Sequence, residues 1–195
     1  MSEVVKSVDL KDGSVLEICQ DSDPGSPREW DNLGIVAVFH GNYDFGDKVD
    51  FTSDQFNDWE EMEAHIRKTY KPIALLPIYM YDHSGITINT TGFSCQWDSG
   101  QIGFIYTTNK KLDELGTALG NDESWPDFVK RLEMYLVQEI TTLDQYVTGD
   151  VYGFRIKDAK GEETDSCWGF YGDDHKTNGI LDHVDKDQIV NLDDL

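Results

Sequence analysis

The sequence is short of cationic residues and has no long apolar run. Its 195 residues include 16 Lys and Arg against 38 Asp and Glu. No window approaches the ~18 consecutive apolar residues that a membrane-spanning helix needs. The N-terminal sequence MSEVVKSVDL also lacks the apolar core of a signal peptide. These absences argue against a membrane protein and predict a cytosolic (cytoplasmic) one.

Cysteine pairs and the common cofactor motifs are missing as well. The three cysteines are widely spaced and form no CxxC pair, which argues against a disulfide framework and a zinc knuckle. There is no P-loop, no GxGxxG turn after a strand, and no HExxH or GxSxG motif. A register resembling an EF-hand loop begins at Asp174, but Lys176 occupies a ligand position and the twelfth residue, Asp185, is not the bidentate Glu. We therefore expect no cofactor and no specific metal.

The formal net charge of −22 is the strongest feature of the composition. Such a surface repels nucleic acid and anionic membranes, and it attracts basic proteins. The acids are spread among aromatic and aliphatic residues along the whole chain, so they do not form a disordered tail. This pattern predicts a folded protein coated in carboxylates, with a protein as its partner.

The order of the predicted elements is typical of an α+β fold. Residues 3–20 are predicted to form a β-hairpin, and residues 151–172 a second one. We expect a single domain over residues 1–195, built as a mostly antiparallel β-sheet with two substantial helices packed on it. The acidic C-terminal segment 173–195 is predicted to dock in part, through a short helix.

Two stretches have the apolar spacing of amphipathic helices. The first runs from Asp54 to Tyr70, with Thr52 or Ser53 as its N-cap and acids in its first turns. The second follows Ser124, which is its predicted cap. The apolar stripe of the second helix is predicted to be Phe128, Leu132, Tyr135, Leu136, Ile140 and Leu143.

The stretch 77–106 is the densest run of β-forming and special residues in the chain. It predicts strands joined by turns at residues 81–85 and 98–100. Pro77 implies a strand edge or a bulge. Core packing is the role expected of the rings of Trp30, Trp97 and Trp168.

Several phrases of the sequence resemble a protein family found in phage and mobile-element genomes. They are PREWDNLG, LPIYMYDHSGITINTTGFSCQWDSGQIGFIY, LDQYVTGDVYGF and DSCWGFYG, and the resemblance extends from about Arg28 to Gly172. The YDHSG, SCxWDSGQxGF and DSCWGFYG motifs carry it. The family is loosely described as antirestriction-like, so the resemblance implies a setting of conflict between phage and host. It gives no catalytic residues.

Charge and resemblance together favour a DNA mimic, a non-enzymatic inhibitor that occupies a basic groove of a host DNA-binding or defence protein. Duplex DNA carries one negative charge per ~1.7 Å of axis, and a rigid domain with closely spaced carboxylates can compete for the same groove. Such a protein would act in the host cytosol without binding nucleic acid or membrane. Pairing of two copies, which would extend the charged surface, is left open.

Three clusters of acids on predicted ordered elements are the candidate binding residues. The first helix contributes Asp54, Asp58, Glu60, Glu61 and Glu63. The turn before it contributes Asp44, Asp47 and Asp50. The C-terminal segment contributes Asp173, Asp174, Asp182, Asp185 and Asp187.

Two other functions are consistent with the sequence. A small hydrolase-like enzyme could use Cys95 as nucleophile, His83 as base and Asp98 as orienting group, if the turns bring them together. His40 is a second candidate base. Alternatively, the protein has a structural or regulatory role and its acidity serves only solubility.

Overall fold

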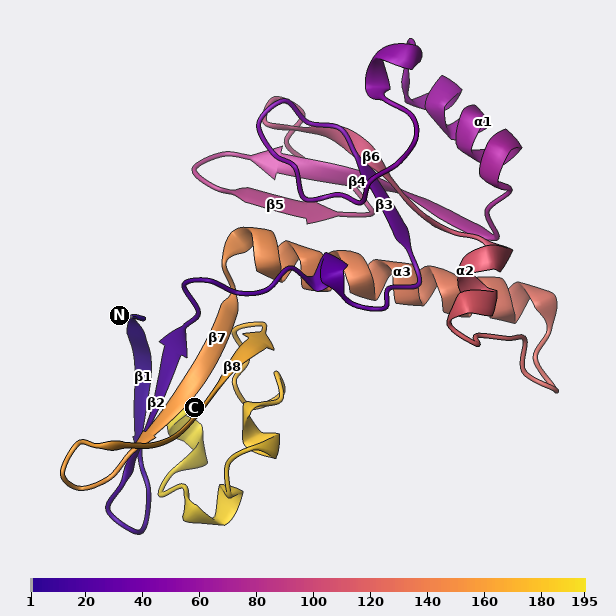
Figure 1. Ribbon diagram of the computed structural model, residues 1–195. Coiled ribbons are helices and arrows are strands. Elements are labelled where there is room, and N and C mark those ends of the chain that lie inside the picture. The colour runs from indigo at the N-terminus through magenta and orange to yellow at the C-terminus, as the bar shows by residue number, and fades with distance from the viewer. Residues whose placement is uncertain (1) are drawn as a thin grey trace. The chain divides into compact units, whose positions relative to one another are not determined.

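The computed structural model describes residues 2–195 and confirms the predicted α+β class (Figure 1). The strands form two antiparallel sheets, and two of the helices are substantial, as expected. Backbone contacts divide the chain into two compact units. The terminal unit comprises the described residues up to Ser26 together with Thr148–Leu195, and the central unit is Pro27–Val147.

The terminal unit is an antiparallel sheet in the order β1-β2-β7-β8. Its strands are β1 (Val4–Asp9), β2 (Val15–Gln20), β7 (Val151–Lys157) and β8 (Glu163–Tyr171). Both predicted hairpins are confirmed, and in the first the Ser14 N–H donates to Asp12 Oδ1 at 2.9 Å. Because β2 pairs with β7, residues from both ends of the chain meet in one sheet.

The C-terminal segment packs on this sheet and completes its core. Ile180, Leu181, Val184 and Ile189 are buried together with side chains of the strands. The predicted short helix is wrong, because the segment forms separate 3-10 turns instead. Those turns are Ile180–Asp182, Lys186–Gln188 and Leu192–Asp194. Gly179, with a φ of 104°, is the N-cap of the first 3-10 turn, and this left-handed backbone conformation favours glycine.

His175 is buried in the terminal unit, with only 6% of its surface exposed. Its ring stands edge-on to that of Tyr152, with the ring centroids 4.7 Å apart. Its Nδ1 lies 3.4 Å from Asn178 Nδ2. Burial, helped by the nearby charge of Lys6, lowers the pKa of His175 below its ordinary value, against the opposite pull of Asp173 and Asp174.

This burial predicts a loss of stability in mild acid. The unfolded chain takes up a proton on this imidazole near pH 6.5, before the folded chain does, so the free energy of unfolding falls as the pH drops through that range. Replacing His175 by Phe keeps a ring beside Tyr152 and removes the titration. The free energy of unfolding can be measured by urea titration at about pH 7.5 and about pH 5.5, with the fluorine NMR signal of fluorotryptophan at Trp168 as the probe. The difference between the two pH values should be smaller in the variant than in the wild type. An unchanged pH effect would contradict the prediction.

The central unit has a second antiparallel sheet, in the order β3-β6-β4-β5, with helices on both faces (Figure 1). Its strands are β3 (Ile35–Val38), β4 (Ala74–Asp82), β5 (Ile86–Asn89) and β6 (Ser99–Thr107). Its helices are α1 (Trp59–Tyr70), α2 (Asn109–Glu114) and α3 (Trp125–Thr148), of which the last residue falls in the terminal unit.

α3 packs against one face of this sheet along its apolar stripe. Phe128, Leu132, Leu136, Ile140 and Leu143 are buried, as predicted, whereas Tyr135 is 40% exposed. The Asp127 N–H donates to Ser124 Oγ at 3.3 Å, which confirms the predicted cap. On the opposite face, Met62 and Ile66 of α1 pack against Phe104 and Tyr106 of β6.

α1 begins later than its sequence pattern predicts. Its N-cap is Asp58, whose carboxylate accepts a hydrogen bond from Glu61 N–H at 2.8 Å. The predicted cap Thr52 instead precedes a short 3-10 helix, Ser53–Gln55. Two capping signals in close succession start two separate helical segments, and the nearer one starts α1.

Two turns are predicted in the stretch 77–106, and the structure has only the first of them. β4 and β5 form a hairpin over residues 82–86, in which Ser84 and Gly85 have positive φ. Pro77 lies where β4 pairs only with β6, beside a register irregularity at Ile78, as predicted. The turn predicted at residues 98–100 is wrong, because Ser99 and Gly100 already pair with β4 as the first residues of β6.

Candidate functional site

Carboxylates cover the surface of both units. The structure describes 37 of the 38 acidic side chains, of which 26 are exposed, 11 are half-buried and none is buried. The sequence of each unit carries a net charge of −11, with 18 acids against seven cationic residues in the terminal unit and 20 against nine in the central one. Acidic residues therefore outnumber cationic ones by more than two to one in the sequence of each unit.

The structure brings two of the three predicted acidic clusters into one segment of the central unit. Residues 44–63 contain eight Asp and Glu and a single Lys. Phe51 in this segment is buried, and its ring contacts those of His65 and Tyr70 on α1. The Tyr70 hydroxyl also donates a hydrogen bond to Asp50. These contacts attach the end of the turn at Asp50 to the helix. Tyr43 and Phe45, on either side of Asp44, pack instead against the core that contains the apolar stripe of α3.

Asp47 does not contribute to the acidic surface in the way the sequence predicts. Its carboxylate pairs with Arg28, whose Nη2 lies 2.6 Å from Oδ2, and it accepts a hydrogen bond from Val36 N–H at 2.8 Å. The Asp47 N–H in turn donates to the Val36 carbonyl at 2.7 Å. Asp47 therefore neutralises a buried arginine and holds its own segment along β3.

The other acids of residues 44–63 are exposed or only half-buried, and several are held in place locally. Asp54 accepts a hydrogen bond from the Thr52 hydroxyl, and Glu61 accepts from the Asn57 amide at 2.8 Å. Glu63 pairs with Arg67 at 2.7 Å. We call this set the α1 acidic surface: Asp44, Asp50, Asp54, Asp58, Glu60, Glu61 and Glu63.

The C-terminal cluster belongs to the terminal unit. Its five members are exposed: Asp173, Asp174, Asp182, Asp185 and Asp187. Asp174 accepts hydrogen bonds from the Thr177 hydroxyl and the Lys176 N–H, and these bonds lower its pKa. Asp185 caps a 3-10 turn. Lys176 and Lys186 reach Asp193 and Asp182, so part of this charge is neutralised.

The structure also brings His83, Cys95 and Asp98 together. Asp98 Oδ2 lies 3.5 Å from His83 Nδ1 and 3.6 Å from Cys95 Sγ. The carboxylate therefore stands between the thiol and the imidazole. In a nucleophilic triad the imidazole stands between the other two groups, where it can take the proton from the nucleophile. In this order of contacts the neighbour of the thiol is the carboxylate and not the imidazole, which differs from the arrangement of such a triad.

The expectation that the tryptophans pack in the core is wrong for three of them. Trp97 is 95% exposed, Trp30 is 54% exposed and Trp168 is 39% exposed. Trp97 lies between Gln96 and Asp98, in a loop that is polar and is followed by Ser99 and Gly100. These polar and small neighbours were the signal of an exposed position. Exposed aromatic rings on ordered segments are common anchors of protein interfaces.

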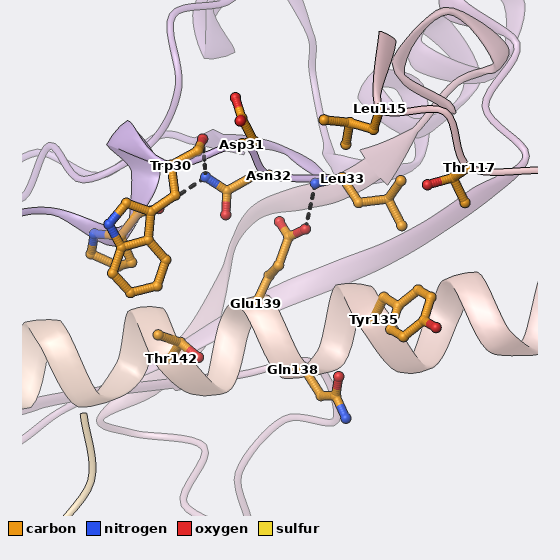
Figure 2. Close-up of a pocket in the computed structure, with 11 residues that line it drawn as sticks. Trp30, Asp31, Asn32, Leu33, Leu115, Thr117, Tyr135, Gln138, Glu139 and Thr142 are labelled. Atoms are coloured by element: carbon orange, nitrogen blue, oxygen red, sulfur yellow. Dashed lines mark hydrogen bonds between the residues drawn. The ribbon is translucent and has the colours of Figure 1, made fainter. Parts of the chain in front are cut away.

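The pocket in Figure 2 lies beside α3 and has a volume of about 320 Å³. Trp30 and Tyr135 form part of its wall, and Glu139 points into it. The Glu139 carboxylate accepts hydrogen bonds from Leu33 N–H at 2.6 Å, from Gly34 N–H at 3.1 Å and from Arg28 at 3.0 Å. Sequence reasoning missed this residue, which anchors residues 28–34 to the helix. Its carboxylate is thus already occupied by bonds within the protein.

The structure therefore defines an acidic α+β protein with exposed carboxylates and exposed aromatic rings. Comparison with protein-family models, curated proteins and solved structures gives no match to this chain. Among the described residues, no helix has the length and apolar character needed to cross a bilayer. Nor do three or more His, Cys, Asp or Glu side chains gather as a metal site in this part of the chain.

Proposed function

We propose that this protein is a phage-type inhibitor that mimics DNA and occupies the basic groove of a host DNA-binding or defence protein. The observation that carries the proposal is the α1 acidic surface, where exposed carboxylates lie on α1 and on the segment that precedes it in the chain. The resemblance to antirestriction-like phage proteins supports the same function. Nuclease or restriction machinery is the typical partner of such an inhibitor.

Order in the acidic surface favours this function over mere solubility. A flexible carboxylate loses side-chain entropy when it pairs with a cation, and an exposed ion pair contributes little for that reason. Asp58 and Glu61 already accept hydrogen bonds at the start of α1, from Glu61 N–H and from the Asn57 amide. Their positions are therefore set before a partner arrives, as the phosphates of a duplex are, and binding orders less of the surface.

Competition with DNA and sensitivity to salt test the proposal. The immobilised protein should capture DNA-binding proteins from host lysate in low salt, and duplex DNA should elute them. With the captured protein purified, raising salt from about 50 mM to about 200 mM should weaken its affinity at least tenfold, because both surfaces are charged. If the affinity changed with neither salt nor duplex DNA, the inhibitor would not be a DNA mimic.

A further inference from the structure

The loop at residues 90–98, which we call the Trp97 loop, is braced at both ends. At its start, Asn89 Oδ1 accepts hydrogen bonds from Thr91 N–H at 3.0 Å and Gly92 N–H at 2.7 Å. At its end, the Ser99 hydroxyl donates to the Cys95 carbonyl, and the Asp98 carbonyl accepts from Asp82 N–H at 2.8 Å. The backbone of the loop is therefore ordered by its own polar contacts.

Trp97 itself extends from this loop into solvent. Its side chain is 95% exposed, and no hydrogen bond or ring contact of it occurs among residues 2–195. An indole is among the largest apolar surfaces that a residue can offer, and leaving it in water is unfavourable. The free energy of burying the indole is gained only when a partner covers the ring.

The chain segment around Trp97 has no Lys or Arg, and Lys130 of α3 reaches only the start of the loop, where it lines a depression with Thr90 and Thr91. No Lys or Arg occurs from Pro72 to Asn109, whereas Asp82 and Asp98 flank the turn and the loop. The Asp98 side chain is 39% exposed. Next to the loop is an open depression of about 510 Å³, lined partly by Tyr79, Phe93 and Gln96. An exposed indole and a carboxylate thus occupy adjacent positions of the loop, and the depression beside them is mostly polar with two aromatic rings in its lining.

We propose that the Trp97 loop docks an arginine side chain of the basic partner, a proposal that rests on the proposed function. The guanidinium lies over the Trp97 ring and pairs with the Asp98 carboxylate. Arginine suits the site better than lysine because its planar guanidinium stacks on aromatic faces, is less strongly hydrated and bonds a carboxylate in a bidentate way. The α1 acidic surface attracts cations of either kind, whereas the Trp97 loop selects arginine.

Blocked hexa-arginine and hexa-lysine peptides, titrated by calorimetry in low salt, separate the two contributions. The wild-type chain is expected to bind the arginine peptide about fivefold to tenfold more tightly than the lysine peptide. Trp97→Ala should abolish this preference and leave lysine binding within about twofold. Trp125→Ala is the matched control, because Trp125 is also exposed, at 55%, but lies at the start of α3. It should retain the preference.

Three results would overturn the arginine site. They are equal binding of the two peptides, failure to bind the arginine peptide, and an unchanged preference in Trp97→Ala. A fourth would reassign the surface: if Trp97→Ala converted a dimer to a monomer in sedimentation without changing peptide binding, the occupant would be a second copy of this chain. None of these four results bears on whether the protein captures a partner in a salt-sensitive way that duplex DNA reverses. The arginine site can therefore fail while the DNA mimic stands, and the two failures are distinguishable.

Discussion

Reversing three charges on the α1 acidic surface is expected to weaken partner binding on the order of 100-fold while the fold survives. The variant combines Asp44→Lys, Asp54→Lys and Glu60→Lys, each at an exposed position. Neither Asp44 nor Glu60 takes part in a hydrogen bond or ion pair within the described chain, so their replacement removes no internal contact. The loss arises because three attractions at a basic groove become repulsions. Affinity for the purified partner, measured by calorimetry in low salt, tests this.

A matched variant distinguishes a local surface from overall charge. Asp31→Lys, Asp113→Lys and Asp122→Lys change the net charge by the same amount, also at exposed positions of the central unit. This variant should bind within about threefold of the wild type, since distant exposed charges are screened. Equal losses in both variants would show that net charge alone drives binding and that the α1 acidic surface has no special part.

Gly103→Ala is expected to destabilise the central unit by about 3 kcal/mol or more, which is above the usual effect of overpacking. Gly103 lies in β6, between β3 and β4. A Cβ there would stand 2.0 Å from the Ala37 carbonyl oxygen and 3.0 Å from Val38 Cα. These are backbone atoms of the neighbouring strand, so β3 would have to move away from β6. Urea unfolding followed by circular dichroism measures the loss.

Gly100 provides the control within the same strand. A Cβ at Gly100 would meet no atom within 4 Å, and the residue has no positive φ. Gly100→Ala should therefore change the free energy of unfolding by no more than about 1 kcal/mol, and in the stabilising direction, because alanine restricts the unfolded chain. Similar destabilisation by both substitutions would contradict the packing explanation.

The two proposals assign different tasks to two parts of the central unit. The α1 acidic surface supplies long-range attraction, which speeds association and falls with salt. The Trp97 loop supplies a short-range contact that depends on the shape and chemistry of one side chain. Salt should therefore act mainly through the first, and Trp97→Ala mainly through the second.

The sequence by itself determined the features that depend on local pattern. The structure confirms four features that follow from residue spacing and turn chemistry. They are the apolar stripe of α3 apart from Tyr135, its Ser124 cap, the Asp12 turn and the 151–172 hairpin. The excess of acids likewise follows from composition, because carboxylates remain at the surface unless they are paired.

Only the tertiary structure decided what depends on pairing between distant residues. β2 pairs with β7 across more than 130 positions, so the two ends of the chain form one compact unit and the residues between them form another. The sequence presents the whole as one domain. Arg28 removes Asp47 from the acidic surface. Within the stretch 77–106, pairing of Ser99 and Gly100 with β4 overrode a local turn signal and left Trp97 in solvent. Local patterns cannot report such contacts, because their energy comes from residues far away in the chain.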